Sequence, residues 1–273
     1  MSRITERFAE LQDRQEKALI CFVTAGDPFP EHTAEVVVAL AGAGCDVVEL
    51  GIPFSDPLLD GPTIQASTQR ALNGGMTPPK VLEVVRQVRT RSNIPLVLMG
   101  AYNPVLQYGP EKFARDAVAV GADGAILSDL SPEESGEWKR AADESGLDTI
   151  FLLAPTSTPA RMALVGRMSR GFLYCMSRAG VTGARNDVPA DLPPLIEAIR
   201  TYADRTPIGV GFGVSRPEQV AAIGEYADGV VVGAALVDCL YRTAAEGKDR
   251  DEVLRTASQF VLSLKAATRR SSM

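Results

Sequence analysis

The sequence predicts an α/β fold, a single (β/α)8 barrel of the TIM type over residues 1–273. Eight short, β-rich apolar runs recur along the chain, with helical patterns between them. Continuous apolar runs mark strands that are buried on both faces, as in a parallel sheet. Eight strand–helix units in 273 residues match the size of this barrel. The predicted strands are Ala18–Thr24, Asp46–Leu50, Pro95–Met99, Gly124–Ser128, Thr149–Ala154, Gly171–Met176, Pro207–Gly211 and Gly229–Gly233.

Helix start signals lie between the predicted strands. Thr77-Pro78-Pro79 precedes a run with apolar residues at helical spacing, and Ser131-Pro132-Glu133-Glu134 combines an N-cap, a proline and acidic residues in the first turn. Ser215-Arg216-Pro217-Glu218 repeats that arrangement. We therefore expect helices to begin at these three places.

The two ends of the chain are expected to lie outside the barrel repeat. Ile4, Phe8 and Leu11 recur at i, i+4 and i+7, so residues 1–15 are predicted to form an extra N-terminal helix that covers the bottom of the barrel. Residues 265–273, which carry two adjacent arginines, are expected to be a frayed tail.

The main structural alternative is an open, doubly wound sheet. No Gly-x-Gly-x-x-Gly follows the first predicted strand, which argues against the dinucleotide-binding version of that fold. Composition does not break along the chain, and no linker indicates a second domain.

Charge and composition exclude several classes of partner. Lys and Arg number 28 against 34 Asp and Glu, a net charge of −6, so neither a nucleic acid nor a membrane surface is expected as a partner. The longest uncharged apolar stretch, Val36–Cys45, is shorter than the roughly 20 residues that span a bilayer. The charged N-terminus is not a signal peptide, and the four cysteines form no Cys-x-x-Cys pair, so a reduced, cytoplasmic protein is expected.

Three carboxylates gather around the second predicted strand. Glu49 lies within that strand, and the Pro/Gly-rich loop after it carries Asp56 and Asp60. In a (β/α)8 barrel the active site lies at the carboxyl ends of the strands. A carboxylate on a strand that faces others on a stiff loop is an arrangement suited to acid–base chemistry.

The positions of lysine and histidine exclude further kinds of chemistry. None of the six lysines lies at the carboxyl end of a predicted strand, so no amine is placed for a Schiff base. The single histidine, His32, lies in the first loop or helix, and we expect no metal site.

Glycines predict a phosphate site in the last two loops. Gly211–Ser215 follows the seventh strand and Gly233–Ala235 follows the eighth, and these loops form the usual phosphate cradle of this fold. Apolar side chains are expected near the mouth and would bind a flat group at the other end of a ligand: Phe22, Ile64, Leu127, Tyr174 and Phe212. With no metal, amine or nucleotide, cleavage of a carbon–carbon bond would need an electron sink within the substrate.

The chain resembles the tryptophan synthase alpha subunit family from end to end. The block over residues 48–65, which holds Glu49 and Asp60, is the most specific match. Other matching segments are 22–28, 102–104, 151–156, 174–183 and 211–215.

The resemblance implies a lyase of tryptophan biosynthesis that cleaves indole-3-glycerol phosphate to indole and glyceraldehyde 3-phosphate. This is a retro-aldol reaction, and indole supplies the electron sink. Glu49 would act as acid and base, taking a proton from the glyceryl hydroxyl and helping to deliver one to indole C3. Asp60 would hydrogen-bond the indole N–H, Tyr174 would position Glu49 and the substrate, and Thr182 would contact Asp60 when a loop over 179–189 closes.

The resemblance also assigns phosphate contacts and shows departures. The phosphate would lie against Gly183, Gly213, Gly233 and Ala234, where the family usually has serine in place of Ala234. Leu59 replaces a usual alanine. Asp56 and Pro57 would contact a beta subunit that holds pyridoxal phosphate, in an α2β2 complex, and this chain itself would hold no cofactor.

Three other functions stay open at this point. One is a stand-alone lyase that releases free indole. A second is an idle subunit kept to activate its partner, which the intact Glu49 and Asp60 argue against. A third is another phosphate-binding barrel, such as a sugar-phosphate isomerase, which the 48–65 block does not support.

Overall fold

A computed structural model of the chain describes residues 2–176, 191–203, 206–211 and 213–269. Within these residues, nine parallel strands form one sheet in the order β5-β4-β3-β2-β1-β9-β8-β7-β6. Their bounds are β1 Ala18–Thr24, β2 Val47–Gly51, β3 Leu96–Gly100, β4 Gly124–Leu127, β5 Asp148–Thr149, β6 Leu152–Leu153, β7 Leu173–Met176, β8 Ile208–Gly211 and β9 Gly229–Val232.

The sheet closes on itself through its fifth predicted strand. β5 and β6 stand at opposite ends of the strand order, yet only Ile150 and Phe151 separate them in the chain. The backbone N–H of Ile150 donates to the carbonyl of Ala125 at 3.0 Å, and the N–H of Tyr174 donates to the carbonyl of Phe151 at 3.2 Å. The two short strands are therefore one interrupted strand, and the predicted eight-stranded α/β barrel is confirmed.

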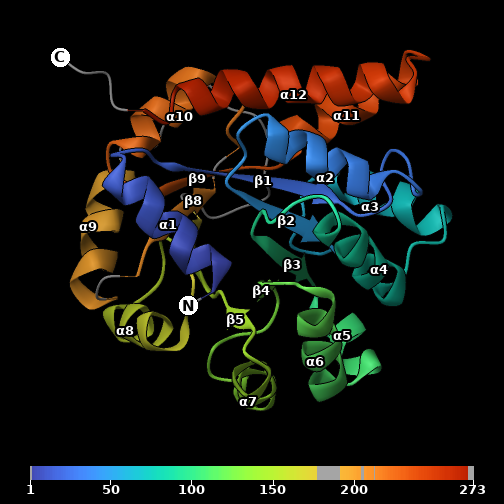
Figure 1. The fold of residues 1–273 in the computed structure, drawn as a ribbon. Helices are drawn as coiled ribbons and strands as arrows, with labels where there is room; N and C mark the ends of the chain where they lie inside the picture. The colour runs from blue at the N-terminus through green and yellow to red at the C-terminus, as the bar shows by residue number, and fades with distance from the viewer. Residues whose placement is uncertain (1, 177–190, 204–205, 212, 270–273) are drawn as a thin grey trace.

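Helices surround the strands as a ring (Figure 1). In the part of the chain that the structure describes they are α1 Arg3–Asp13, α2 Thr33–Gly42, α3 Pro62–Asn73, α4 Pro78–Arg89, α5 Tyr102–Tyr108, α6 Pro110–Val120, α7 Gly136–Ser145, α8 Pro159–Met168, α9 Leu192–Tyr202, α10 Pro217–Gly224, α11 Ala234–Ala245 and α12 Arg250–Ala266.

Two of the three predicted helix starts are confirmed. Thr77 is the N-cap of α4, and α10 begins with a proline at residue 217. The start at Ser131 is wrong, because α7 begins only at Gly136. The N–H of Glu134 donates to the Ser131 carbonyl, and the Ser131 hydroxyl donates to the Glu134 carboxylate, so these residues close a turn instead of capping a helix.

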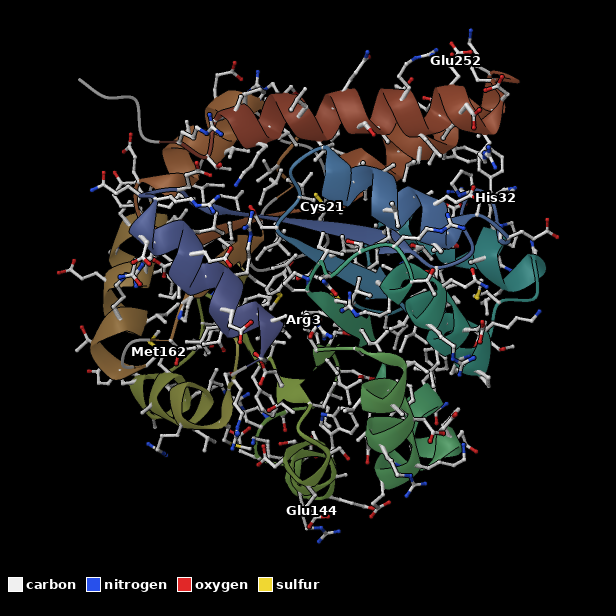
Figure 2. All side chains as sticks on the ribbon, viewed as in Figure 1. Arg3, Cys21, His32, Glu144, Met162 and Glu252 are labelled. Carbon is white, nitrogen blue, oxygen red and sulfur yellow. The ribbon has the colours of Figure 1, made fainter. Side chains whose placement is uncertain are left out.

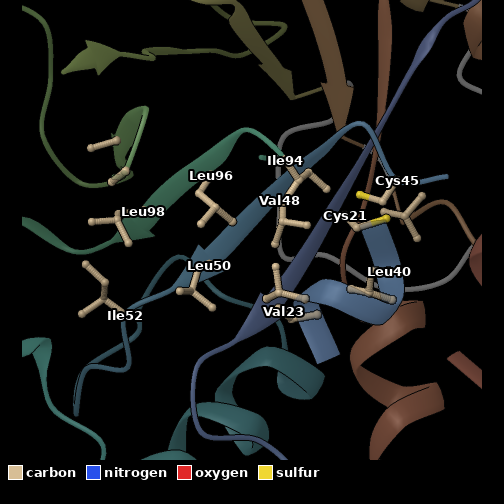
Figure 3. Packing of buried hydrophobic residues seen from close by; sticks show 14 of the residues in the cluster. Cys21, Val23, Leu40, Cys45, Val48, Leu50, Ile52, Ile94, Leu96 and Leu98 are labelled. Carbon is tan, nitrogen blue, oxygen red and sulfur yellow. The ribbon is translucent and has the colours of Figure 1, made fainter. Parts of the chain in front are cut away.

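Strand side chains alternate between an outer and an inner apolar layer, as the two-residue period of a strand requires. On β1, Leu19, Cys21 and Val23 join the large cluster beneath the surrounding helices, part of which Figure 3 shows. Ala18 and Ile20 face the barrel interior and join a second cluster. Charged side chains such as Glu144 and Glu252 point away from the barrel at its periphery (Figure 2).

The helix α1 closes the bottom of the barrel. Its buried residues Ile4, Phe8 and Leu11 belong to the interior cluster, so the apolar stripe predicted from the sequence fills the barrel floor. Burial of each such side chain stabilises the fold by about 1.5–3 kcal/mol. An ion pair of 2.7 Å between Arg7 and the fully buried Asp46 fixes the helix to the barrel.

The expected frayed tail differs from the structure over residues 265–269. Helix α12 continues to Ala266, and Lys265 Nζ lies 2.8 Å from a carboxylate oxygen of Asp46. Thr268 is buried, and Arg269 forms an antiparallel bridge with Glu16. The C-terminal segment is held in place because the buried carboxylate of Asp46 needs positively charged partners, and Lys265 is one of them. Residues 270–273 lie outside the described residues.

Candidate active site

Glu49 is a buried carboxyl group with no hydrogen-bond partner. It faces the interior because its neighbours Val48 and Leu50 belong to the outer layer. The residue is 0% exposed, and its two carboxyl oxygens are the only buried side-chain oxygen or nitrogen atoms without a partner among the described residues. Burial raises the pKa of Glu49 to about 8. Orphaned buried polar groups are rare in proteins, and this one sits where a barrel places its chemistry.

Tyr174 lies within electrostatic reach of both Glu49 and Asp60. Tyr174 faces the interior from β7 and packs against the inner cluster. Its pKa is raised well above 10, first by burial and then by the negative charges of Glu49, Cys175 and Asp60. Tyr174 therefore lies near both carboxylates that the sequence singled out, the one on the strand and the one on the loop.

Asp60 precedes the first turn of α3. Its N–H donates to the carbonyl of Pro57 at 3.1 Å, and its own carbonyl accepts from the Gln65 amide at 2.8 Å. The loop is thus held by its backbone, which leaves the Asp60 side chain available. Partial burial raises the pKa of Asp60 to about 6.

Asp56 lies apart from this group, on the exposed part of the same loop. Its carboxylate accepts a 2.5 Å hydrogen bond from the Ser55 hydroxyl, and its carbonyl accepts from the N–H of Leu58. The next two side chains, Leu58 and Leu59, are 86% and 59% exposed. The loop therefore has an inner carboxylate and an outer, apolar surface.

A small apolar cluster lines the interior on the mouth side. Phe22 and Ile64, both predicted there, pack with Val237, and Met99 and Ala234 lie against them. The sequence reasoning missed Met99 and Val237. Their signals were present: Met99 occupies an inward position at the end of a strand, and Val237 lies one helical turn after Ala234.

Leu127 does not join this cluster. Ile126 belongs to the inner layer, and alternation along β4 places Leu127 in the outer layer beneath the helices. The prediction that Leu127 points toward the mouth is therefore wrong. Phe212, Thr182 and Gly183 lie outside the described residues.

The predicted phosphate end is built from two adjacent strand ends. β8 and β9 pair in parallel, so the loops that follow them emerge side by side. Gly213 has a φ of +53°, a conformation that favours glycine, and Gly233 is the N-cap of α11 with Ala234 as its first residue. The first N–H groups of a helix have no partner within it and attract anions. No three His, Cys, Asp or Glu side chains are grouped as a metal site in the described ranges.

Comparison with known proteins shows which family the chain belongs to. The family model described as "Tryptophan synthase alpha chain" matches residues 8–269. The chain belongs to the tryptophan synthase alpha chain family. The alpha chain of Geobacter sulfurreducens is 51% identical over 267 residues, which cover 98% of this chain and 99% of that relative. Among solved structures, subunit alpha of Legionella pneumophila has a TM-score of 0.88 at 38% identity and covers 98% of both chains. Tryptophan synthase of Mycobacterium tuberculosis gives 0.89 at 39% identity, with 99% of both chains covered.

Membership in the tryptophan synthase alpha chain family confirms the activity that the sequence indicated. The alpha subunit is an enzyme subunit, a lyase of tryptophan biosynthesis that cleaves indole-3-glycerol phosphate to indole and glyceraldehyde 3-phosphate. No helix in the described part of the chain is long and apolar enough to cross a membrane.

Proposed function

We propose that Glu49 is the acid and base of the retro-aldol cleavage and that Asp60 stabilises the charge that develops on the indole ring. The observation that carries this assignment is the buried, unpartnered carboxyl of Glu49, which lies close enough to Tyr174 to raise its pKa, as Asp60 does.

Both carboxyl groups have raised pKa values, and the pKa of Glu49 is higher than that of Asp60. Burial raises the pKa of Glu49 to about 8 and that of Asp60 to about 6. Between these values Glu49 carries a proton and Asp60 carries a negative charge. Pairs of titratable groups whose environments separate their pKa values are typical of acid–base catalysis.

The reaction then proceeds in two proton transfers. Protonated Glu49 gives its proton to indole C3, and the ionised Asp60 accepts a hydrogen bond from the ring N–H as the ring becomes positive. The Glu49 carboxylate next takes the proton of the glyceryl hydroxyl beside the ring. The C–O bond becomes a carbonyl, the bond to C3 breaks, and its electron pair restores the indole. Glu49 ends the cycle protonated, as it began.

The remaining residues bind and orient the substrate. The apolar cluster of Phe22, Ile64, Met99 and Val237 suits the flat indole ring, and the first turn of α11, from Gly233 and Ala234, suits the phosphate. Gly213 completes the anion site from the neighbouring loop. Tyr174 would hold the substrate against Glu49.

We further propose a beta subunit as partner, bound through the outer face of the 53–62 loop. Asp56 and Pro57 would take part in the contact. The exposed Leu58 and Leu59 support it, because adjacent apolar side chains exposed to solvent often mark a protein–protein interface. The pyridoxal phosphate that converts indole to tryptophan would belong to that partner. A cytoplasmic location is proposed as well, which four free cysteines fit.

An indole-release assay with and without a cognate beta subunit tests this function. We expect the chain to release indole and glyceraldehyde 3-phosphate in equal amounts, and the beta subunit to accelerate the release. Glu49→Gln should reduce the rate by roughly 100-fold or more, since a positioned acid–base group contributes that much. Full activity of the Gln variant would contradict the role of Glu49, and a rate indifferent to the beta subunit would favour a stand-alone lyase.

A further inference from the structure

Arg70, on α3, contacts two other parts of the rim around the proposed site and so joins three elements. Its guanidinium donates two hydrogen bonds to Asp27, from Nε to Oδ1 at 2.6 Å and from Nη2 to Oδ2 at 2.8 Å. The Asp27 side chain is only 2% exposed, while that of Arg70 is 29% exposed. The same guanidinium lies over the ring of Tyr241, with Cζ 3.7 Å from the ring centroid.

Each of these residues belongs to an element that carries one wall of the site. Asp27 follows β1, the strand of Phe22. Arg70 lies on α3, which begins directly after the Asp60 loop and carries Ile64. Tyr241 lies on α11, the helix whose first turn is the proposed phosphate site.

On α11, the ring that Arg70 stacks on shares a helix face with the phosphate end. Tyr241 lies four residues after Val237 and seven after Ala234, so the three residues lie on one side of the helix. Val237 belongs to the apolar cluster of the mouth. A shift of α11 at Tyr241 would therefore move both the apolar wall and the phosphate end.

A second contact fixes α3 to the same strand end. Thr24 Oγ1 and Ser67 Oγ lie 2.7 Å apart, and both residues are buried. The Ser67 hydroxyl donates to the carbonyl of Ile64 at 2.8 Å, so Thr24 donates to Ser67. This contact joins α3 to β1 but does not reach α11. Helix α3 meets α11 at two places, where Ile64 packs with Val237 and where Arg70 stacks on Tyr241.

We propose that Arg70 is a positioning residue, which sets the phosphate helix α11 at a fixed place relative to Asp60 and Ile64 by binding Asp27 and stacking on Tyr241. The inference rests on the proposed function, because it assigns the phosphate to α11. Arginine suits this task and lysine does not, since only a planar guanidinium binds a carboxylate through two bonds and stacks on a ring at once.

The charge pair fixes Arg70 against the end of β1. Burial raises the pKa of Asp27, and the hydrogen bonds and charge of Arg70 act in the opposite direction. A buried charge with a single charged partner holds that partner firmly, because separating the pair leaves an uncompensated charge.

The test measures the affinity of the isolated chain for glycerol 3-phosphate by calorimetry in four variants. Arg70→Lys and Tyr241→Leu should each weaken binding roughly fivefold, the size of a lost cation–π contact or of a small displacement. Tyr241→Phe keeps the ring and should bind within about twofold of the original protein. Arg242→Leu is the matched control, because Arg242 is exposed on the same helix and pairs with Asp238 one turn earlier.

Two further readouts separate positioning from simple stability. The Arg70→Lys/Tyr241→Leu double variant should bind glycerol 3-phosphate no more weakly than the weaker-binding single variant, because both substitutions remove the same contact between the guanidinium and the ring. The KM for indole-3-glycerol phosphate should rise in step with the dissociation constant. If the folded single variants melt earlier but bind glycerol 3-phosphate like the original protein, Arg70 serves only stability and the inference is overturned.

The two proposals fail separately. If the chain releases indole but the variants all bind glycerol 3-phosphate with the affinity of the original protein, only the role of Arg70 is contradicted. A chain that releases no indole contradicts the proposed function, and the binding series still decides whether Arg70 positions an anion site on α11.

Discussion

The ring of Tyr174 lies directly against the backbone of Gly211 on the neighbouring strand. A Cβ atom at position 211 would come within 2.7 Å of the ring carbon Cζ, and closer still to the hydroxyl. Only glycine leaves room at this place for Tyr174, which lies within electrostatic reach of Glu49.

Gly211→Ala should therefore displace Tyr174 and lower kcat/KM for indole release by roughly 10-fold to 100-fold, as small displacements in active sites do. The matched control is Gly136→Ala on α7, where nothing lies within 4 Å of an added Cβ. Steady-state kinetics of both variants measure the effect. Equal kinetics for the two would show that the position of Tyr174 does not matter.

Removing the ionisable group at position 49 should stabilise the protein at high pH. The pKa of Glu49 is raised by burial from 4.5 to about 8 in the folded state. The fold therefore prefers the protonated form, and the group costs nothing below about pH 4.5 and progressively more as pH rises to about 8. Glu49→Gln, which cannot ionise, should gain about 3 kcal/mol at pH 7 relative to the original protein.

Urea unfolding at pH 5, 7 and 9 measures this gain. We expect the difference between Glu49→Gln and the original protein to be small at pH 5 and to grow toward pH 9. Glu144→Gln, at an exposed position, should show no such growth. A stability difference that stays constant with pH would mean that Glu49 ionises as freely in the fold as in water.

The sequence predicted the barrel well because its strands are continuous apolar runs, and it predicted Glu49 because that carboxylate interrupts one of them. The 48–65 block then separated Asp60 from Asp56, and the structure places the first inside and the second outside. Leu127 was misplaced because the alternation along its own strand was not applied. The split of the fifth strand between Thr149 and Leu152 left no mark in its apolar pattern.

Other features depend on contacts that no local pattern announces. Arg70 and Asp27 are 43 positions apart, and nothing near either residue indicates the other. Lys265 seemed to belong to a tail because its partner, Asp46, is 219 positions away. Met99 and Val237 became visible as a wall of the site only once the inner layer of the barrel was known.

Ala234→Ser should tighten phosphate binding. Ala234 is the first residue of α11, where a serine hydroxyl would add one donor to the backbone N–H groups. A hydrogen bond to a charged group contributes about 1.5–3 kcal/mol, so the KM for indole-3-glycerol phosphate should fall roughly tenfold with little change in kcat. Ala235→Ser is the neighbouring control, and an unchanged KM in Ala234→Ser would contradict the phosphate assignment.

Leu58→Ser should weaken the response to a beta subunit without altering the isolated chain. The Leu58 side chain is 86% exposed, so its loss leaves the barrel intact but removes apolar area from the proposed contact. Titration of a cognate beta subunit against indole release should give a lower apparent affinity. The exposed Leu262→Ser on α12 is the control. Equal titrations for the two variants would remove the loop from the interface.

The most direct test of the account is the pH dependence of kcat/KM for indole release. Because the pKa of Asp60 is raised by burial to about 6 and that of Glu49 to about 8, the active form has Asp60 ionised and Glu49 protonated. The account predicts a bell-shaped profile that rises with an apparent pKa of about 6 and falls with one of about 8. A rate that keeps increasing above pH 8 would contradict it, since the ionised form of Glu49 would then begin the reaction.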